Sequence, residues 1–220
     1  MMEPAVDDVA PDGSPVPVYL AMPAHDALDL VRDQVPPGGS MLDLGCGVGR
    51  LANALADAGF AVTGVDIHER MLAHLSPAVD AVHADIAGLN LGMTFDVVVL
   101  ASHLVNHPTD AGAFLTTCRR HVADHGVVLV ERFHPDLLDA FDQQEGAVHG
   151  VHIRHEVQTR QGAQFSASAH YTVAGRTWTQ DYAAVLLDDA ALAELLRTAG
   201  LAPDAWLDDD ARWLRAVPAS

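Results

Sequence analysis

The chain has 220 residues and a mass of 23.3 kDa, and 50% of its residues are hydrophobic. This length and composition fit one globular domain with a large core and exclude a disordered chain. Acidic residues outnumber basic ones by 30 to 12, which gives a net charge of -18. Because such a surface repels phosphate backbones and anionic lipids, we expect neither nucleic acid nor a membrane as a partner.

In the first part of the chain, strand patterns alternate with helix patterns. Residues 1–17 are predicted to form a flexible arm, and apolar residues at helical spacing predict a helix over 18–35. Short apolar runs predict strands over residues 40–44, 61–66, 80–85, 95–100 and 127–131. Helices are predicted between them over residues 50–58, 69–75 and 110–122. This alternation predicts an α/β fold with a doubly wound parallel sheet.

After residue 131 the pattern changes to longer, more polar strands. Glycine-containing turns join three predicted strands into an antiparallel β-meander, over residues 149–158, 164–173 and 176–187. Asp188 and Asp189 are predicted to cap a helix over 190–199, and two strands follow, over 205–207 and 213–217. The two cysteines, Cys46 and Cys118, are too few for a disulfide framework and are expected to be reduced.

A glycine-rich loop, Asp43-Leu44-Gly45-Cys46-Gly47-Val48-Gly49, lies between the first predicted strand and a helix. Glycines at such a junction let the backbone turn sharply and let a ligand approach it closely, and the helix N-terminus offers N–H donors. Gly47, Gly49 and Ala52 satisfy the dinucleotide fingerprint, which would place Asp66 on a ribose. Asp43 argues against a dinucleotide, because its carboxylate would repel a pyrophosphate. It favours a ligand that carries a cation.

Acids also end the next two predicted strands, in Gly64-Val65-Asp66-Ile67 and in Ala84-Asp85-Ile86, and Phe95-Asp96 opens the fourth. With the glycine loop, these segments resemble the motifs of the class I S-adenosylmethionine-dependent methyltransferases. The match covers most of the chain from Ser40 to Val217. The resemblance implies a seven-stranded Rossmann-like sheet with an antiparallel last strand, and S-adenosyl-L-methionine as the cofactor.

The resemblance also implies cofactor contacts. Asp66 would bind the ribose hydroxyls, Ile67 would lie on the adenine, and Asp85 would accept a hydrogen bond from the adenine amino group. Tyr19 would close over the methionyl group, or else pack on the first helix. The implied cofactor site contains Tyr19, Asp43, Gly45, Gly47, Gly49, Asp66, Ile67, Asp85, Ile86 and Ala101. The implied organisation is one domain over 18–220, with a β insert over 147–187 on the acceptor side.

Histidines follow the fourth and fifth predicted strands, near the point where a doubly wound sheet binds its ligands. His103, His107 and His134 are candidate general bases, because the ordinary pKa of histidine is near neutrality. On a helical turn, His103 and His107 would share one face and could bind a metal, although we expect none. Otherwise one is a solvent-exposed loop residue and the other packs against the cofactor.

Four further residues are candidates for binding the acceptor. Arg132 suits a substrate carboxylate or phosphate, or else it forms an ion pair with a nearby acid. Tyr171, Trp178 and Tyr182 lie in the β-meander, where they would line an acceptor pocket or form the core of that sheet.

These patterns predict an S-adenosylmethionine-dependent methyltransferase that acts on a nitrogen or oxygen of a small molecule. The alternatives are an enzyme that uses the same cofactor in another reaction, such as cyclisation of its side chain, and a non-catalytic cofactor-binding protein. Without a basic or apolar leader in the N-terminal residues, we expect a cytoplasmic protein. A free sheet edge makes a homodimer possible.

Overall fold

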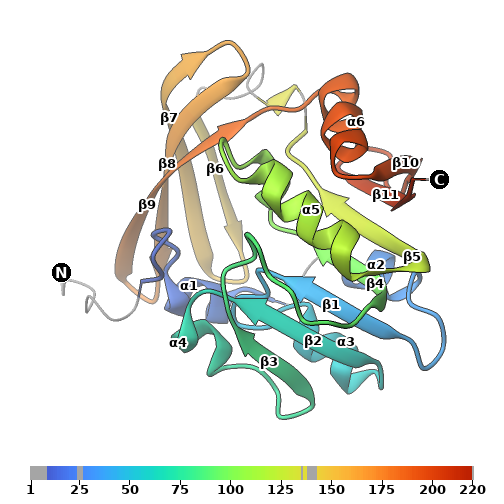
Figure 1. Cartoon of the computed structure of the whole chain (residues 1–220). Coiled ribbons are helices and arrows are strands. Elements are labelled where there is room, and N and C mark those ends of the chain that lie inside the picture. The colour runs from blue at the N-terminus through green and yellow to red at the C-terminus, as the bar shows by residue number, and fades with distance from the viewer. Residues whose placement is uncertain (1–8, 24–26, 135, 138–142, 220) are drawn as a thin grey trace.

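The computed structural model describes residues 9–23, 27–134, 136–137 and 143–219. Its main sheet has seven strands in the order β10-β11-β5-β4-β1-β2-β3 (Figure 1). The strands are β1 (Ser40–Leu44), β2 (Ala61–Asp66), β3 (Val79–His83), β4 (Phe95–Leu100), β5 (Val122–Glu131), β10 (Leu201–Trp206) and β11 (Trp213–Pro218). The pairs from β5 to β3 are parallel, and β11 is antiparallel to both of its neighbours. This confirms the predicted Rossmann-like methyltransferase sheet and its antiparallel last strand.

Helices cover both faces of the main sheet (Figure 1). They are α1 (Val16–Ala21), α2 (Leu28–Arg32), α3 (Ala52–Asp57), α4 (Glu69–Leu72), α5 (Ala111–His121) and α6 (Asp189–Thr198), with a 3-10 turn, η2, at Leu104–Asn106. Strand β4 is apolar except at Asp96, because the rest of the strand is buried on both faces. Val98 and Leu100 pack in the same core cluster as α5 and α6, whereas Val97 and Val99 pack in the cluster that contains α2 and α3.

The single helix predicted over 18–35 is two short helices, α1 and α2. Proline explains the break. The N–H of Met22 donates to the carbonyl of Val18, but Pro23, the next residue, has no N–H with which to continue the helix. None of the described helices is long and apolar enough to cross a membrane.

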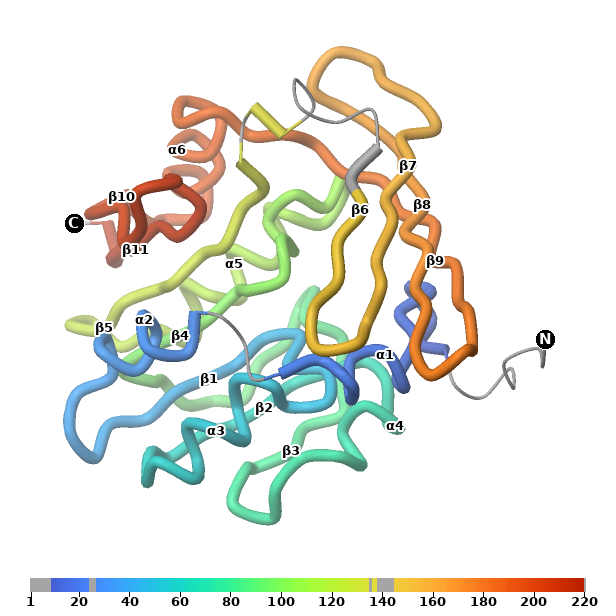
Figure 2. Tube along the Cα trace, turned by 180° about the vertical axis from the view of Figure 1, so that it is seen from behind, coloured from blue at the N-terminus to red at the C-terminus, as the bar shows by residue number. Residues whose placement is uncertain are grey.

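A second, antiparallel sheet lies between β5 and α6 in the chain (Figure 2). It contains four strands rather than the three predicted: β6 (Gln143–Val148), β7 (Val151–Gln161), β8 (Gln164–Val173) and β9 (Arg176–Val185). The unpredicted strand β6 is at the edge of this sheet and has no alternating apolar pattern. The inner face of the sheet, with Phe165, Tyr171 and Trp178, packs against α1 and the segment after β5.

Candidate active site

The glycine loop follows β1, at the edge of the main sheet where the parallel strands end. Gly45, Gly47 and Gly49 have φ angles of +76°, +55° and +84°, a region that side chains disfavour. A Cβ on Gly49 would lie 2.5 Å from a methyl carbon of Leu75, so a larger residue there meets the fold itself. A Cβ on Gly47 would have no atom within 4 Å, so it would project into open space. That space is a cradle for a ligand against the loop.

Two acids at strand ends flank this cradle. Asp43 is only 3% exposed, at the end of β1. The carboxylate of Asp66, at the end of β2, accepts hydrogen bonds from the backbone N–H groups of Gly47 and His68, both at 2.8 Å. Burial raises the pKa of Asp66, while these two N–H groups oppose the increase. Each carboxylate oxygen retains a second lone pair, with which Asp66 can accept from a ligand hydroxyl.

An apolar platform lies beyond Asp66. Ile67 is 51% exposed, which is unusual for a large apolar side chain in a well-packed domain. The ring of His83 holds the Ile67 carbonyl at 2.8 Å, so the backbone under the platform is fixed. Asp85 is exposed and accepts from the N–H of Ala87 at 2.8 Å, whereas Ile86 is buried. These residues fit an adenosyl group that carries hydroxyls, a flat base and, nearer Asp43, a cationic centre.

The backbone after β4 is strained. Ser102 and His103 both adopt left-handed conformations, with φ angles of +55° and +61°. The N–H of Ser102 donates to the buried carboxylate of Glu131 at 2.7 Å, which ties the end of β4 to the end of β5. Such paired strain persists where the surrounding structure enforces it, typically at functional sites. Ala101, just before this pair, is buried.

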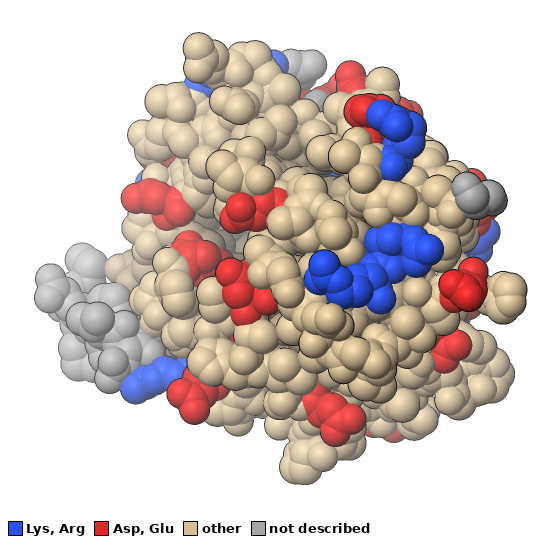
Figure 3. Space-filling view, in the orientation of Figure 1, with Lys and Arg blue, Asp and Glu red and all other residues tan. Residues whose placement is uncertain are grey.

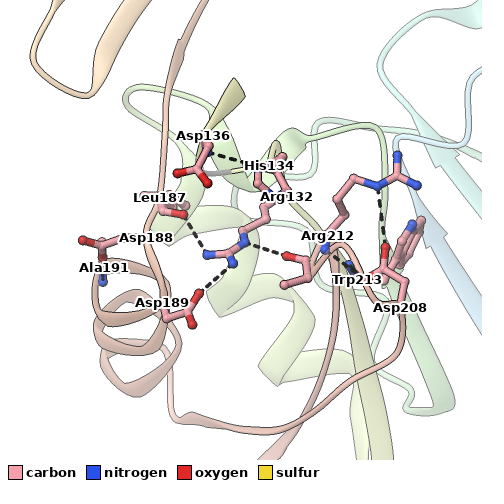
Figure 4. Close-up of polar contacts among 11 residues, drawn as sticks. Arg132, His134, Asp136, Leu187, Asp188, Asp189, Ala191, Asp208, Arg212 and Trp213 are labelled. Atoms are coloured by element: carbon pink, nitrogen blue, oxygen red, sulfur yellow. Dashed lines mark hydrogen bonds and ion pairs between the residues drawn. The ribbon is translucent and has the colours of Figure 1, made fainter. Parts of the chain in front are cut away.

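The three candidate histidines occupy different environments. His103 stacks on Phe133, with ring centroids 4.0 Å apart. His107 accepts the N–H of Asp110 on its Nδ1 at 3.1 Å and so faces the start of α5. A 3-10 turn separates His107 from the left-handed His103, so they do not form the predicted helical pair. Nδ1 of His134 accepts the N–H of Asp136 at 3.1 Å (Figure 4).

Arg132 is 1% exposed, and the fold itself occupies its guanidinium (Figure 4). Nε donates to the carbonyl of Ala211 at 2.9 Å, and Nη1 donates to that of Leu187 at 2.8 Å. Nη2 forms an ion pair with Asp189 at 2.6 Å, and the group lies 4.3 Å above the ring of Trp206. The geometry therefore favours the alternative interpretation, an ion pair that fastens β5 to α6. It offers no support for a role in substrate binding.

Five rings from both sheets meet above the end of β4. This ring cluster contains His103, Phe133, His155, Phe165 and Tyr182. Phe133 lies 6.0 Å from Phe165, which lies 6.1 Å from Tyr182, and the hydroxyl of Tyr182 is 3.3 Å from Nδ1 of His155. Burial lowers the pKa of His155, and the charges of His103 and His170 lower it further.

Sequence analysis named Tyr182 as a possible pocket residue but did not single out His155, Phe133 or Phe165 as site residues. The signal was the alternation along β7, which places His155 on the same face as the buried Val151 and the outward-facing His152 on the other. Using that signal requires knowledge of which face of the second sheet is covered, and this depends on tertiary packing.

The aromatic residues expected at the acceptor side are also on the inner face. Tyr171 and Trp178 are 7% and 5% exposed and pack with Val18 of α1. Nε1 of Trp178 is a buried donor with no partner in the described part of the chain. Tyr19 hydrogen-bonds to Tyr171, and burial raises the pKa of both phenols. Tyr171 and Trp178 thus fit both interpretations, as the core of the second sheet and as the lining of an acceptor pocket. The described residues contain no cluster of three or more groups that could hold a metal ion.

Comparisons with known proteins also point to a methyltransferase. Residues 41–126 match the family model of a methyltransferase domain. A dTDP-3-amino-3,6-dideoxy-alpha-D-glucopyranose N,N-dimethyltransferase from Streptomyces fradiae is 30% identical over 69% of this chain and 64% of its own. A ubiquinone biosynthesis O-methyltransferase from Caulobacter sp. (strain K31) is 36% identical over 41% of this chain and 39% of its own. The chain therefore matches less than two thirds of the length of either relative.

Solved structures share the fold over most of their length. A methyltransferase from Streptomyces caelestis superposes with a TM-score of 0.72, at 22% identity and over 88% of both chains. An amino pentose methyltransferase from Micromonospora echinaspora, solved with S-adenosylmethionine bound, has a TM-score of 0.68, at 24% identity and over 90% of both chains. The methyltransferase domain matched over residues 41–126, the relatives and the shared fold together support a class I S-adenosylmethionine-dependent methyltransferase with S-adenosylmethionine as its cofactor.

Proposed function

We propose that this chain transfers a methyl group from S-adenosylmethionine to an amino group of a small-molecule acceptor, with amino sugars as the first class to test. The observation that carries the proposal is the ring cluster, in which His103 from the end of β4 and His155 from the second sheet both contact an aromatic region. The Streptomyces fradiae relative is named as an amino-sugar N,N-dimethyltransferase, which supports an amine.

The cofactor side follows from the glycine loop. Asp66 accepts from the ribose hydroxyls, Ile67 and Ile86 hold the adenine, and Asp85 accepts from its amino group. Asp43 attracts the cationic end of the ligand, and Gly45, Gly47 and Gly49 allow it to lie against the backbone. Ala101 and Tyr19 complete the wall of the site. When bound, S-adenosylmethionine supplies a sulfonium methyl group that an amine lone pair can displace.

His103 holds the position for a general base. An amine acceptor arrives protonated at neutral pH, and it must lose a proton before its lone pair can react. A ring nitrogen of His103 would take that proton, while His155, neutral because its pKa is lowered, orients the amine from the opposite side. His134 is the second candidate for the base. His107 is the weakest of the three, because its Nδ1 faces the start of α5.

Charge around the site favours a cationic acceptor. Several acidic side chains lie between the second sheet and the strand ends of the main sheet, whereas most basic side chains on the face shown lie over α5 and α6 (Figure 3). The guanidinium of Arg132 is already held by Leu187, Ala211 and Asp189. Tyr171 and Trp178 supply aromatic surface beside the ring cluster, and the Nε1–H of Trp178 is a donor for an acceptor oxygen.

The test is a methyl-transfer assay with labelled S-adenosylmethionine and matched acceptor pairs, each an amino sugar and the same sugar with a hydroxyl in place of the amine. We expect methylation of the amine member, detected by mass. His103→Gln should lower kcat by about 10²–10⁴ with unchanged affinity for S-adenosylhomocysteine. His125→Gln, at an exposed histidine of β5 with no proposed role, is the matched control. Full activity in separate His103, His107 and His134 variants would rule out a histidine base and leave positioning by the second sheet as the mechanism.

O-methylation is the second candidate, because ubiquinone biosynthesis O-methyltransferases are also among the relatives. The same matched pairs decide it, since an O-methyltransferase would modify the hydroxyl member. Release of methylthioadenosine without a methylated product would favour cyclisation of the cofactor side chain. Tight cofactor binding with no turnover would favour a non-catalytic role. Cytoplasmic location and homodimer formation stay predictions, to be tested by fractionation and sedimentation.

A further inference from the structure

The segment before the main sheet, which we call the strap, covers residues 9–22. Sequence analysis predicts a flexible arm over much of it, but the described part is folded and packed. Ala10 and Val16 pack in one cluster with Val48 of the glycine loop and Met71 of α4. In both views, α1 lies between the end of the second sheet and the glycine-loop edge of the main sheet (Figures 1 and 2). The strap therefore contacts the cofactor loop directly.

A tight turn at the start of the strap holds its shape. The N–H of Ala10 donates to the carbonyl of Ser14 at 2.8 Å, and Gly13 between them has a φ of +85°. The carboxylate of Asp12 accepts from the Ser14 N–H at 3.0 Å and from its hydroxyl at 2.6 Å. Asp12 also raises the pKa of Asp66. Because water and salt screen charges beyond about 10 Å, this effect agrees with a turn near the carboxylate at the ribose position.

One residue of the second sheet joins this turn to the inner face of the sheet. Gln180 lies on β9 between Trp178 and Tyr182, on the same face as both. Its Nε2 donates to the hydroxyl of Ser14 at 3.0 Å and approaches the carbonyl of Asp12 at 3.5 Å. Its Oε1 accepts from the hydroxyl of Tyr171 at 3.1 Å. One amide thus bonds to the strap on one side and to the acceptor sheet on the other.

We infer that Gln180 is a positioning residue that latches the strap over the cofactor site, so that release of the cofactor product depends on a residue of the acceptor sheet. In this arrangement Gln180 acts through Ser14 and Tyr171 rather than through the ligand. The inference concerns cofactor exchange and does not depend on which acceptor the enzyme methylates.

The latch predicts faster exchange when it is broken. Ligand leaves when the strap opens, and opening requires loss of the bond from Gln180 to Ser14. A hydrogen bond of this kind contributes about 1 kcal/mol net, which corresponds to roughly a fivefold change in an equilibrium. Gln180→Leu should therefore raise the dissociation rate of S-adenosylhomocysteine by about fivefold, without slowing association and with little change in melting temperature.

The experiment measures dissociation of S-adenosylhomocysteine from the full chain by stopped-flow displacement, with melting temperature recorded for every variant. Ser14→Ala breaks the same bond from the strap side, so it should speed release similarly, and the double variant should be no faster than either single one. Gln158→Leu is the matched control, because its amide bonds to Ser168 on the outer face of the same sheet. It should release ligand at the wild-type rate.

Three results would overturn the latch. The first is a dissociation rate in Gln180→Leu within twofold of that of the control. The second is full additivity in the double variant, which would mean that the two residues act separately. The third is a loss of melting temperature that accounts for the faster release. Failure of the acceptor assay would leave these measurements unaffected, because they use S-adenosylhomocysteine alone.

Discussion

Asp66 gives the sharpest test of the cofactor site. Replacement by alanine removes the carboxylate that we place on the ribose hydroxyls, and it also removes the acceptor for the N–H groups of Gly47 and His68, each 2.8 Å away. A hydrogen bond to a charged group is worth about 1.5–3 kcal/mol. We therefore expect Asp66→Ala to weaken S-adenosylhomocysteine binding by about 10- to 150-fold.

Isothermal titration calorimetry with S-adenosylhomocysteine measures this loss. Asp80→Ala is the matched control, because Asp80 is an exposed acid on the neighbouring strand β3 and its removal changes the net charge equally. Asp66→Asn should be intermediate, since its amide keeps one oxygen as an acceptor. Equal affinities in Asp66→Ala and Asp80→Ala would refute the assignment of Asp66 to the ribose.

Three further outcomes follow from the geometry. Gly47→Val should abolish S-adenosylhomocysteine binding in a protein that stays folded by circular dichroism, because its Cβ projects into the cradle with no atom of the fold within 4 Å, at a positive φ that valine disfavours; normal binding would contradict the cradle. Arg132→Met should cost about 1–3 kcal/mol of unfolding free energy in urea, because it leaves the Leu187 and Ala211 carbonyls without their donor; unchanged stability with a raised KM for the acceptor would restore a substrate role. Because burial raises the folded-state pKa of Asp66, the ligand-free protein should lose stability as pH rises from the ordinary carboxyl pKa through the raised value. Over the same range S-adenosylhomocysteine affinity should fall on acidification, and Asp66→Asn should flatten both profiles.

The main sheet was predictable because its signals are local. The segment Phe95–Leu100, which is apolar except at Asp96, is strand β4 with the predicted bounds, since a strand buried on both faces is apolar at nearly every position. The glycine loop and the acids Asp43 and Asp66 lie at strand ends, so a short stretch of sequence specifies both the turn and the groups beside it. Asp188 caps α6 through the N–H of Ala191, as the Asp-Asp pair predicts.

Predictions that depended on long-range packing were less accurate. Sequence patterns did not reveal β6, because an edge strand with polar residues on both faces has no period. Arginine is a residue type expected at an anion site, which is why Arg132 was predicted to bind substrate. Its actual partners, Leu187, Asp189 and Ala211, come from distant segments that only the folded chain brings together. The break after α1 follows from Pro23. One continuous helix was predicted there because apolar residues on both sides of Pro23 keep a helical spacing.

The contrast between local signals and long-range packing also applies to the cofactor half and the acceptor half of the candidate site. One loop and the strands beside it form the cofactor half, so a short sequence motif specifies the groups that would bind the cofactor. The acceptor half that we propose lies where the inner face of the second sheet meets the end of β4, and strand register sets the positions of its side chains, His155 and Tyr182. Gln180, on that face, also bonds to the strap that packs on the glycine loop. A substitution on the inner face can therefore change both acceptor choice and cofactor exchange.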